Sequence, residues 1–142
     1  MAEKDSIVLT FDVDSDDFTR AGEASSRLKR TLKQMGLPPD IIRRISIVMY
    51  EGEINMVIHA HGGKITVTVD DDAVTMVLAD VGPGIPDVEK AMQAGWSTAS
   101  EAVRQHGFGA GMGLPNMKKN ADTLEIDTVV GVGTTVTAVV RL

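Results

Sequence analysis

"IIRRISIVMYEGEINMVIHA", residues 41–60, decides the fold because its apolar side chains recur at the spacing of an α-helix. Ile45, Val48 and Ile58 are among the residues that set this period. The preceding "LPPD", residues 37–40, breaks the chain and then supplies a typical helix start. We therefore predict one long helix here.

Two polar residues interrupt the apolar pattern of this helix. Glu51 and Asn55 are four residues apart, so their side chains project from the same face, in line with Ile47 and Ile58. We expect this stripe to be inward or half-buried, where a carboxylate and a carboxamide cost stability unless they meet a ligand, a metal or water. The pair is therefore a candidate site. The spacing alone leaves open a helix that turns both side chains to solvent.

The N-terminal segment predicts one strand and one helix. Residues 6–13 alternate apolar and polar side chains like an edge strand. The acidic segment 14–17, which contains three aspartates, suits the positive N-terminal end of a helix, which we expect to reach about Met35 and to be closed by Gly36.

Four further segments predict strands. Residues 64–69 and 73–79 are β-branched runs joined by three aspartates, which is typical of a hairpin, and residues 124–129 and 134–141 form a second pair. Residues 113–120 predict a short helix between the pairs. The fold class expected is α+β: a two-layer sandwich with a mixed, mostly antiparallel sheet and helices on one face.

Length and composition predict one domain, residues 1–142, with a core of its own. A net charge of −6 and a pI near 4.9 weigh against nucleic-acid binding, which needs many basic side chains. The chain has no cysteine, which excludes thiol chemistry. The sequence carries neither a signal-peptide pattern nor an apolar run of the roughly 20 residues that span a bilayer. We expect a cytoplasmic protein that binds no membrane.

A second candidate motif follows the predicted hairpin. Asp80 ends a strand, and Gly82 and Gly84 come directly after it. The carboxylate is thereby held at a rigid point while the glycines leave the approach to it open, which favours recognition of a flat hydrogen-bond donor. The alternative is an ordinary turn, for which these residue types are common.

"QHGFGAGMGLPNMKK", residues 105–119, has glycine at four alternate positions: Gly107, Gly109, Gly111 and Gly113. No Gly-Lys-Ser/Thr follows, so the stretch is not a P-loop, and the spacing does not match a dinucleotide fingerprint. The remaining interpretation is a glycine-rich segment that leads into a helix N-terminus. Its exposed backbone N–H groups could wrap a polyphosphate. The alternative is a flexible loop without a ligand.

The order of these motifs is more specific than any one of them. Glu51-x-x-x-Asn55, Asp80-x-Gly82-x-Gly84, the glycines up to Gly113 and a Gly-Thr-Thr at residues 133–135 follow one another. This series resembles the histidine-kinase-like ATPase fold shared by gyrase, histidine kinases and MutL, and within it the small anti-sigma-factor and switch-protein serine kinases of bacteria. The motifs that carry the resemblance lie in residues 41–142. The N-terminal segment is similar to the family only in its arrangement of a strand followed by a helix.

The resemblance implies a role for each motif. Asn55 would coordinate Mg²⁺ that bridges the ATP phosphates, Asp80 would accept a hydrogen bond from the adenine amino group, and Glu51 would be the catalytic base. The remaining residues implied to contact or cover ATP are Gly82 and Gly84 at the adenine, Thr134 near the base, His59 beside the nucleotide, Ser97 and Thr98 near the phosphates, and Gly107, Gly109, Gly111 and Gly113 in a lid and its hinge. Met56 stands where the family usually has a small residue.

The function that the resemblance implies is an ATP-dependent protein serine/threonine kinase. Its substrate would be a small regulatory partner, a STAS-type anti-sigma-factor antagonist, in a bacterial partner-switching pathway. The alternative is a module that uses ATP to sequester a sigma factor or another regulator without phosphotransfer. Glu51 favours the enzyme, because a pure binder has no use for a base. A homodimer is a further expectation, from the resemblance and from the apolar edge strand.

Overall fold

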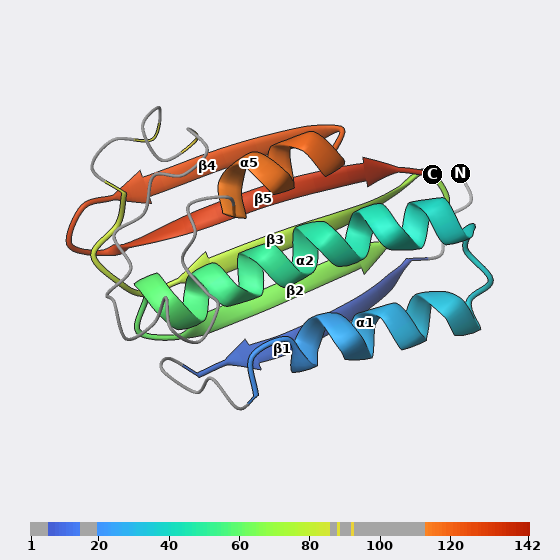
Figure 1. Ribbon diagram of the computed structural model, residues 1–142, viewed down its shortest axis with the longest axis horizontal. Helices are drawn as coiled ribbons and strands as arrows, with labels where there is room; N and C mark the ends of the chain where they lie inside the picture. The colour runs from blue at the N-terminus through green and yellow to red at the C-terminus, as the bar shows by residue number, and fades with distance from the viewer. Residues whose placement is uncertain (1–5, 15–19, 86–87, 89–91, 93–112) are drawn as a thin grey trace.

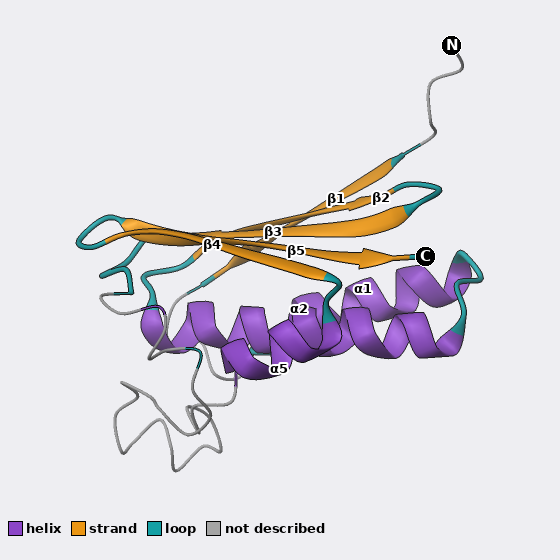
Figure 2. Cartoon of the chain, turned by 90° about the horizontal axis from the view of Figure 1, so that it is seen from above, coloured by secondary structure: helices purple, strands orange, loops and turns teal. Residues whose placement is uncertain are grey.

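The computed structural model describes residues 6–14, 20–85, 88, 92 and 113–142. Among these residues lie the strands β1 (Ile7–Val13), β2 (Gly63–Val69), β3 (Ala73–Asp80), β4 (Thr123–Val129) and β5 (Gly133–Arg141), and the helices α1 (Glu23–Gln34), α2 (Pro39–His59) and α5 (Gly113–Asn120). The strands form one sheet in the order β1-β2-β3-β5-β4 (Figure 1). The three helices lie together on one face of this sheet (Figure 2). The predicted α+β sandwich is confirmed, and each strand pairing described is antiparallel rather than mixed.

The core lies between the sheet and the helices. Ile65 and Val67 of β2 are fully buried, whereas Thr66 between them is half-buried, which is the two-residue period of a strand with one covered face. Leu28 and Leu32 of α1 are four residues apart and equally buried, as helical spacing requires. Each such side chain contributes about 1.5–3 kcal/mol relative to an exposed one.

The predicted long helix is α2, and it lies across the middle of the sheet (Figure 1). Gly52, halfway along it, faces β3 and α5. A Cβ atom added at Gly52 would overlap Leu78 of β3 and would lie 3.2 Å from the Met117 side chain of α5. The missing side chain therefore lets α2 approach both neighbours closely, which brings Glu51 and Asn55 near α5.

The predicted start of the first helix was wrong. The helix begins at Glu23, not directly after residues 14–17, and it follows Gly22, whose φ of 92° is left-handed. Its end agrees with the prediction, since the helix stops at Gln34 and Gly36 has a φ of 80°.

The start of α1 is determined by a carboxylate on another helix. Glu53 of α2 is buried and accepts hydrogen bonds from the backbone N–H groups of Gly22, Ala24 and Ser25, at 3.0–3.1 Å. The N-cap residue itself makes no side-chain cap. Glu53 therefore satisfies N–H groups that the first turn of a helix leaves unpaired, and its charge is favourable at that end of the helix dipole.

No helix in the described ranges is both long and apolar enough to cross a bilayer.

Candidate functional site

The stripe on α2 faces the start of α5. Glu51 and Asn55 are both half-buried, as are Ile47 and Ile58, so the predicted inward or half-buried stripe is confirmed. A Cβ atom added at Gly113, the first residue of α5, would lie 2.8 Å from Asn55 Nδ2 and 3.0 Å from its Oδ1. The Asn55 carboxamide therefore lies directly against the helix start, in space that a larger residue at this position would fill.

Glu51 lies one turn earlier on α2 and meets the same short helix. Its Oε1 atom is 3.5 Å from Asn116 Nδ2, a long hydrogen bond. Burial raises the pKa of Glu51 above the ordinary value of a glutamate, and the Asn116 amide opposes this by stabilising the charged form. A half-buried carboxylate with a raised pKa and one weak partner is suited to accept a proton.

Asp80 is held at the end of β3 by the neighbouring strand. Its Oδ1 atom accepts a hydrogen bond from the backbone N–H of Thr134 in β5, at 2.9 Å. Burial raises the Asp80 pKa, and the Thr134 N–H group opposes the rise. Within the part of the chain that is described, Oδ2 has no hydrogen-bond partner. The carboxylate is thus oriented by one oxygen and can accept a ligand donor with the other.

The glycine turn after Asp80 packs against the connection between β4 and β5. The Gly82 N–H donates to the Val132 carbonyl at 3.1 Å. Gly84 has a φ of 77°, and a Cβ atom there would lie 2.7 Å from the Val129 carbonyl oxygen. Both the backbone conformation and the close approach require glycine at this position. The contacts with the β4–β5 connection therefore hold the glycine turn in a fixed position beside Asp80.

The two groups of polar residues lie at the same end of the sheet. Met56, next to Asn55 on α2, is buried against Gly63, where an added Cβ atom would lie 2.5 Å from Met56 Cε and 2.8 Å from Asp80 Cα. Figure 1 shows the C-terminal end of α2, the end of β3 and the start of α5 on one side of the molecule. Gly63 also accommodates the large Met56 side chain, the one departure from the family pattern noted above.

The structure describes only some of the residues expected at the site. Glu51, Asn55, Asp80, Gly82, Gly84, Gly113 and Thr134 are all described, and His59 is the last residue of α2. Ser97, Thr98, Gly107, Gly109 and Gly111 lie outside the described residues.

Two residues near the site were missed by sequence reasoning. Asn116 contacts Glu51, and its position one turn after Gly113 was a signal that could have identified it. Thr128 lies opposite Thr134 in the β4–β5 register, and their hydroxyl oxygens are 3.0 Å apart. Thr128 Oγ1 also accepts a hydrogen bond from the Ile85 N–H at 2.8 Å, so it ties the glycine turn to Thr134. No local pattern indicates this role, because it depends on strand register.

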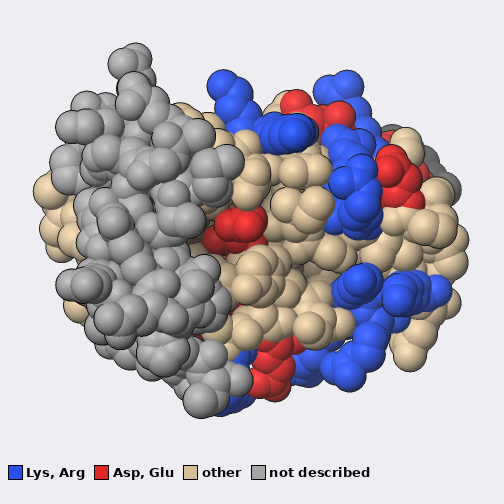
Figure 3. Space-filling model, viewed as in Figure 1, with Lys and Arg blue, Asp and Glu red and all other residues tan. Residues whose placement is uncertain are grey.

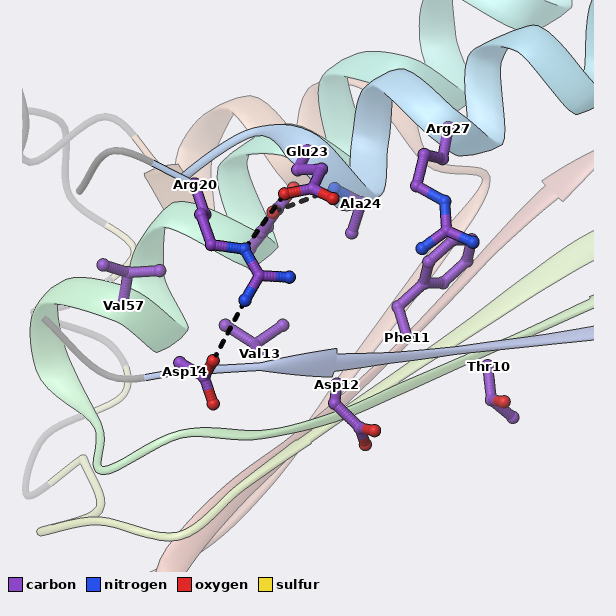
Figure 4. Close-up of a pocket in the computed structure, with 11 residues that line it drawn as sticks. Thr10, Phe11, Asp12, Val13, Asp14, Arg20, Glu23, Ala24, Arg27 and Val57 are labelled. Carbon is purple, nitrogen blue, oxygen red and sulfur yellow. Dashed lines mark hydrogen bonds and ion pairs between the residues drawn. The ribbon is translucent and has the colours of Figure 1, made fainter. Parts of the chain in front are cut away.

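A separate pocket of about 230 Å³ lies between β1 and α1 and contains none of the candidate catalytic residues. In Figure 4 the Arg20 guanidinium lies between Asp14 at 3.5 Å and Glu23 at 3.1 Å. The Arg27 guanidinium lies 5.7 Å from the centre of the Phe11 ring. Both cations are paired with a carboxylate or an aromatic face, and we interpret these contacts as structural.

Comparison with known proteins shows similarity over most of the chain. Residues 15–140 match the histidine kinase-like ATPase domain family. The serine/threonine-protein kinase RsbT of Bacillus subtilis is 31% identical over 121 residues, which cover 82% of this chain and 85% of that protein. The anti-sigma F factor of Caldanaerobacter subterraneus is 37% identical over 100 residues, 67% of this chain and 66% of that protein. The anti-sigma F factor of Bacillus licheniformis is 32% identical over 111 residues, 74% and 73% of the two chains.

Proposed function

Because the chain belongs to the histidine kinase-like ATPase family, we propose that it is an ATP-dependent protein serine/threonine kinase that acts on a small regulatory protein. One observation carries the proposal: Glu51 and Asn55 share a half-buried stripe that faces the start of α5. The names of the relatives, a serine/threonine-protein kinase and several anti-sigma factors, support the same activity.

Asp80 is the residue that we assign to the adenine base. Its Oδ1 atom is occupied by the Thr134 N–H, which leaves Oδ2 to accept a hydrogen bond from an exocyclic amino group. The close approach of Gly133 to Asp80, where a Cβ atom would overlap the Asp80 carbonyl, keeps β5 near this carboxylate. Gly82, Gly84 and Thr134 would line the same side of the ligand.

Asn55 is the residue that we assign to Mg²⁺. In the described part of the chain no three His, Asp or Glu side chains gather into a metal site, so a site built from protein carboxylates has no support there. A single amide oxygen fits a magnesium ion that takes its other ligands from phosphates and water, and Gly113 leaves the Asn55 carboxamide space. The ion would neutralise charge on the transferred phosphoryl group.

Glu51 is the residue that we assign to proton transfer. A seryl or threonyl hydroxyl is a weak nucleophile, and a carboxylate within hydrogen-bond distance can accept its proton as the hydroxyl oxygen bonds to the γ-phosphorus of ATP and ADP leaves. Burial raises the pKa of Glu51 and makes it a stronger base, and Asn116 restrains its side chain. Both Glu51 and Asn55 are held by α2, so their separation is determined by one rigid element.

The partner that we propose is a STAS-type antagonist of an anti-sigma factor, by analogy with the regulators to which the chain is similar. Sequestration of a sigma factor without phosphotransfer has no observation in its favour and leaves the position of Glu51 unexplained. A cytoplasmic homodimer remains part of the proposal.

The proposal is tested by incubating the purified chain with radiolabelled ATP, Mg²⁺ and STAS-domain proteins of the same genome. We expect one partner to become labelled on serine or threonine. Glu51→Gln keeps the shape of the side chain but removes its basicity, and we expect it to lower the phosphorylation rate at least about 100-fold while the ATP affinity stays within a few-fold.

Glu125→Gln, at an exposed position on β4, is the matched control and keeps the wild-type rate. Wild-type transfer by Glu51→Gln would exclude the base role. Mg-ATP binding without transfer to any partner would favour the sequestering module instead.

A further inference from the structure

A groove of about 680 Å³ lies between α1 and α2, apart from the pocket of Figure 4. Leu37 and Pro39, at the connection between the two helices, line one end of it, and Tyr50 and Glu51 line it farther along α2. At 1.5 Å per residue, Pro39 and Glu51 are about 18 Å apart along the helix axis. The groove is therefore long enough for an extended segment of about five residues.

The floor of this groove is apolar. Leu37 and Ile47 are half-buried and Ile42 is buried, and these apolar side chains line the groove. Tyr50 is 41% exposed, and its ring contacts the backbone at Gly22, where an added Cβ atom would lie 3.2 Å from the ring. An exposed aromatic ring beside aliphatic side chains is typical of a protein-binding surface.

The rim of the groove is basic although the chain as a whole carries a net charge of −6. Lys29 and Lys33 of α1 are one turn apart and line it, together with Arg43 of α2. Arg43 pairs with Asp40 at 3.0 Å, whereas neither lysine has an ion-pair partner among the residues that the structure describes. Figure 3 shows Lys and Arg side chains on both sides of an uncharged strip on the helical face. The local charge favours an acidic occupant.

The groove also reaches the proposed catalytic base. Glu51 is the one carboxylate among its lining residues in the described part of the chain, and it lies on the stripe shared with Asn55. A segment bound in the groove would therefore be continuous with a hydroxyl presented to Glu51. This continuity favours the phosphorylated protein as the occupant over a protein bound elsewhere.

We propose that the groove between α1 and α2 docks an acidic, partly apolar segment of the protein that the kinase phosphorylates. The proposal rests on the proposed function for the role of Glu51, and it adds the surface that selects the substrate. The acidic side chains of the segment pair with Lys29 and Lys33, and its apolar side chains cover Leu37, Ile47 and Tyr50.

Binding is tested with a fluorescent 12-residue peptide of alternating aspartate and leucine that ends in serine, and with the same peptide carrying lysine for aspartate. We expect the full chain to bind the acidic peptide and not the basic one, and added salt to weaken binding. The double variant Lys29→Glu/Lys33→Glu is expected to bind the acidic peptide at least about tenfold more weakly, because two attractive contacts become repulsive.

The matched control is Arg30→Glu/Lys64→Glu, which changes the net charge equally at exposed positions that do not line the groove. It is expected to keep the wild-type affinity. Equal loss in both variants, no binding of the acidic peptide, or equal binding of the basic peptide would overturn the proposal. Loss of a dimer in the Lys29→Glu/Lys33→Glu variant, seen by light scattering, would assign the groove to a second copy instead.

Calorimetry with Mg-ATP separates this inference from the kinase assignment. Both double variants should bind Mg-ATP as the wild type does. If the peptide results hold but no variant binds Mg-ATP, the kinase assignment fails while the docking surface stands. If Mg-ATP binds normally and the charge reversal leaves peptide affinity unchanged, only the docking surface fails.

Discussion

Three carboxylates near the site differ in function because their partners differ. Glu53 accepts three backbone hydrogen bonds and is buried, so it has little remaining capacity for a ligand. Among the described residues Glu51 accepts one hydrogen bond, of 3.5 Å, and Asp80 uses one oxygen for the Thr134 N–H. All three residues are acidic, so residue type alone does not tell a structural carboxylate from one that is available to a ligand. Hydrogen-bond saturation assigns Glu53 to structure and leaves Glu51 and Asp80 available for chemistry.

The pH dependence of phosphotransfer should report on Glu51. A base acts when ionised, so the rate falls as the pH drops through the pKa of Glu51, which burial places above the ordinary value. Asn116→Ala removes the hydrogen bond that lowers this pKa, and the acid limb of the pH–rate profile should therefore move to higher pH. Lys119→Ala, at an exposed position on the same helix, is the control, and an unmoved limb in Asn116→Ala would show that another group titrates.

Asp80→Asn tests the adenine contact. The asparagine Oδ1 atom can still accept from the Thr134 N–H, but an NH₂ group then replaces the free oxygen and faces the donor on the base. We expect ATP affinity to fall about 10- to 100-fold, or about 1.4–2.8 kcal/mol, measured by titration calorimetry. Asp127→Asn, exposed on β4, should change nothing, and an unaltered affinity in Asp80→Asn would exclude the assignment.

At the scale of elements, α2 organises the molecule because it meets neighbours on several faces. Glu53 caps α1, Gly52 permits close contact with β3 and α5, and Glu51 and Asn55 face the start of α5. The cap and the candidate base are separated by Gly52 alone. The contact with α1 and the contact with α5 therefore lie within one turn of the same helix.

Glu53→Ala tests the contribution of this cap to stability. It leaves three N–H groups at the start of α1 without an acceptor, in surroundings that are mostly buried. We expect the free energy of unfolding to fall by about 3–5 kcal/mol, measured by urea denaturation. Glu23→Ala, an exposed residue of the same first turn, should cost less than about 1 kcal/mol. A similar small loss in Glu53→Ala would mean that water replaces the cap.

At the scale of the whole molecule, the candidate site joins elements from both layers. Asp80 and Thr134 belong to the sheet, whereas Glu51, Asn55 and Gly113 belong to the helices. A ligand that contacts both layers binds the folded chain and not the unfolded one, so it must stabilise the fold.

Mg-ATP at 100 times its Kd should raise the free energy of unfolding by about 2.7 kcal/mol, seen as an increase of several degrees in Tm. Glu51→Gln should keep this increase, and Asp80→Asn should lose about half of it or more at the same concentration. An unchanged Tm of the wild type with saturating Mg-ATP would contradict the binding site itself.

Elements whose signals are local could be predicted from the sequence alone. The period of residues 41–60 predicted α2, the β-branched runs predicted the hairpin of β2 and β3, and Gly36 predicted the end of α1. The sequence also supplied the candidate residues Glu51, Asn55 and Asp80, because their order along the chain resembles a known series. Periodicity and turn chemistry depend on neighbouring residues, so they can be read without a fold.

Contacts between groups that are distant in the sequence became visible only in the folded chain. The tertiary structure placed β5 between β3 and β4, which brings the Thr134 N–H to Asp80. It moved the start of α1 to Glu23 through a carboxylate 30 residues away at Glu53, and it set Asn116 beside Glu51. The physical reason is that hydrogen bonding and burial at these positions depend on contacts between elements, and no local pattern in the sequence specifies which acceptor a helix end or a strand end will find.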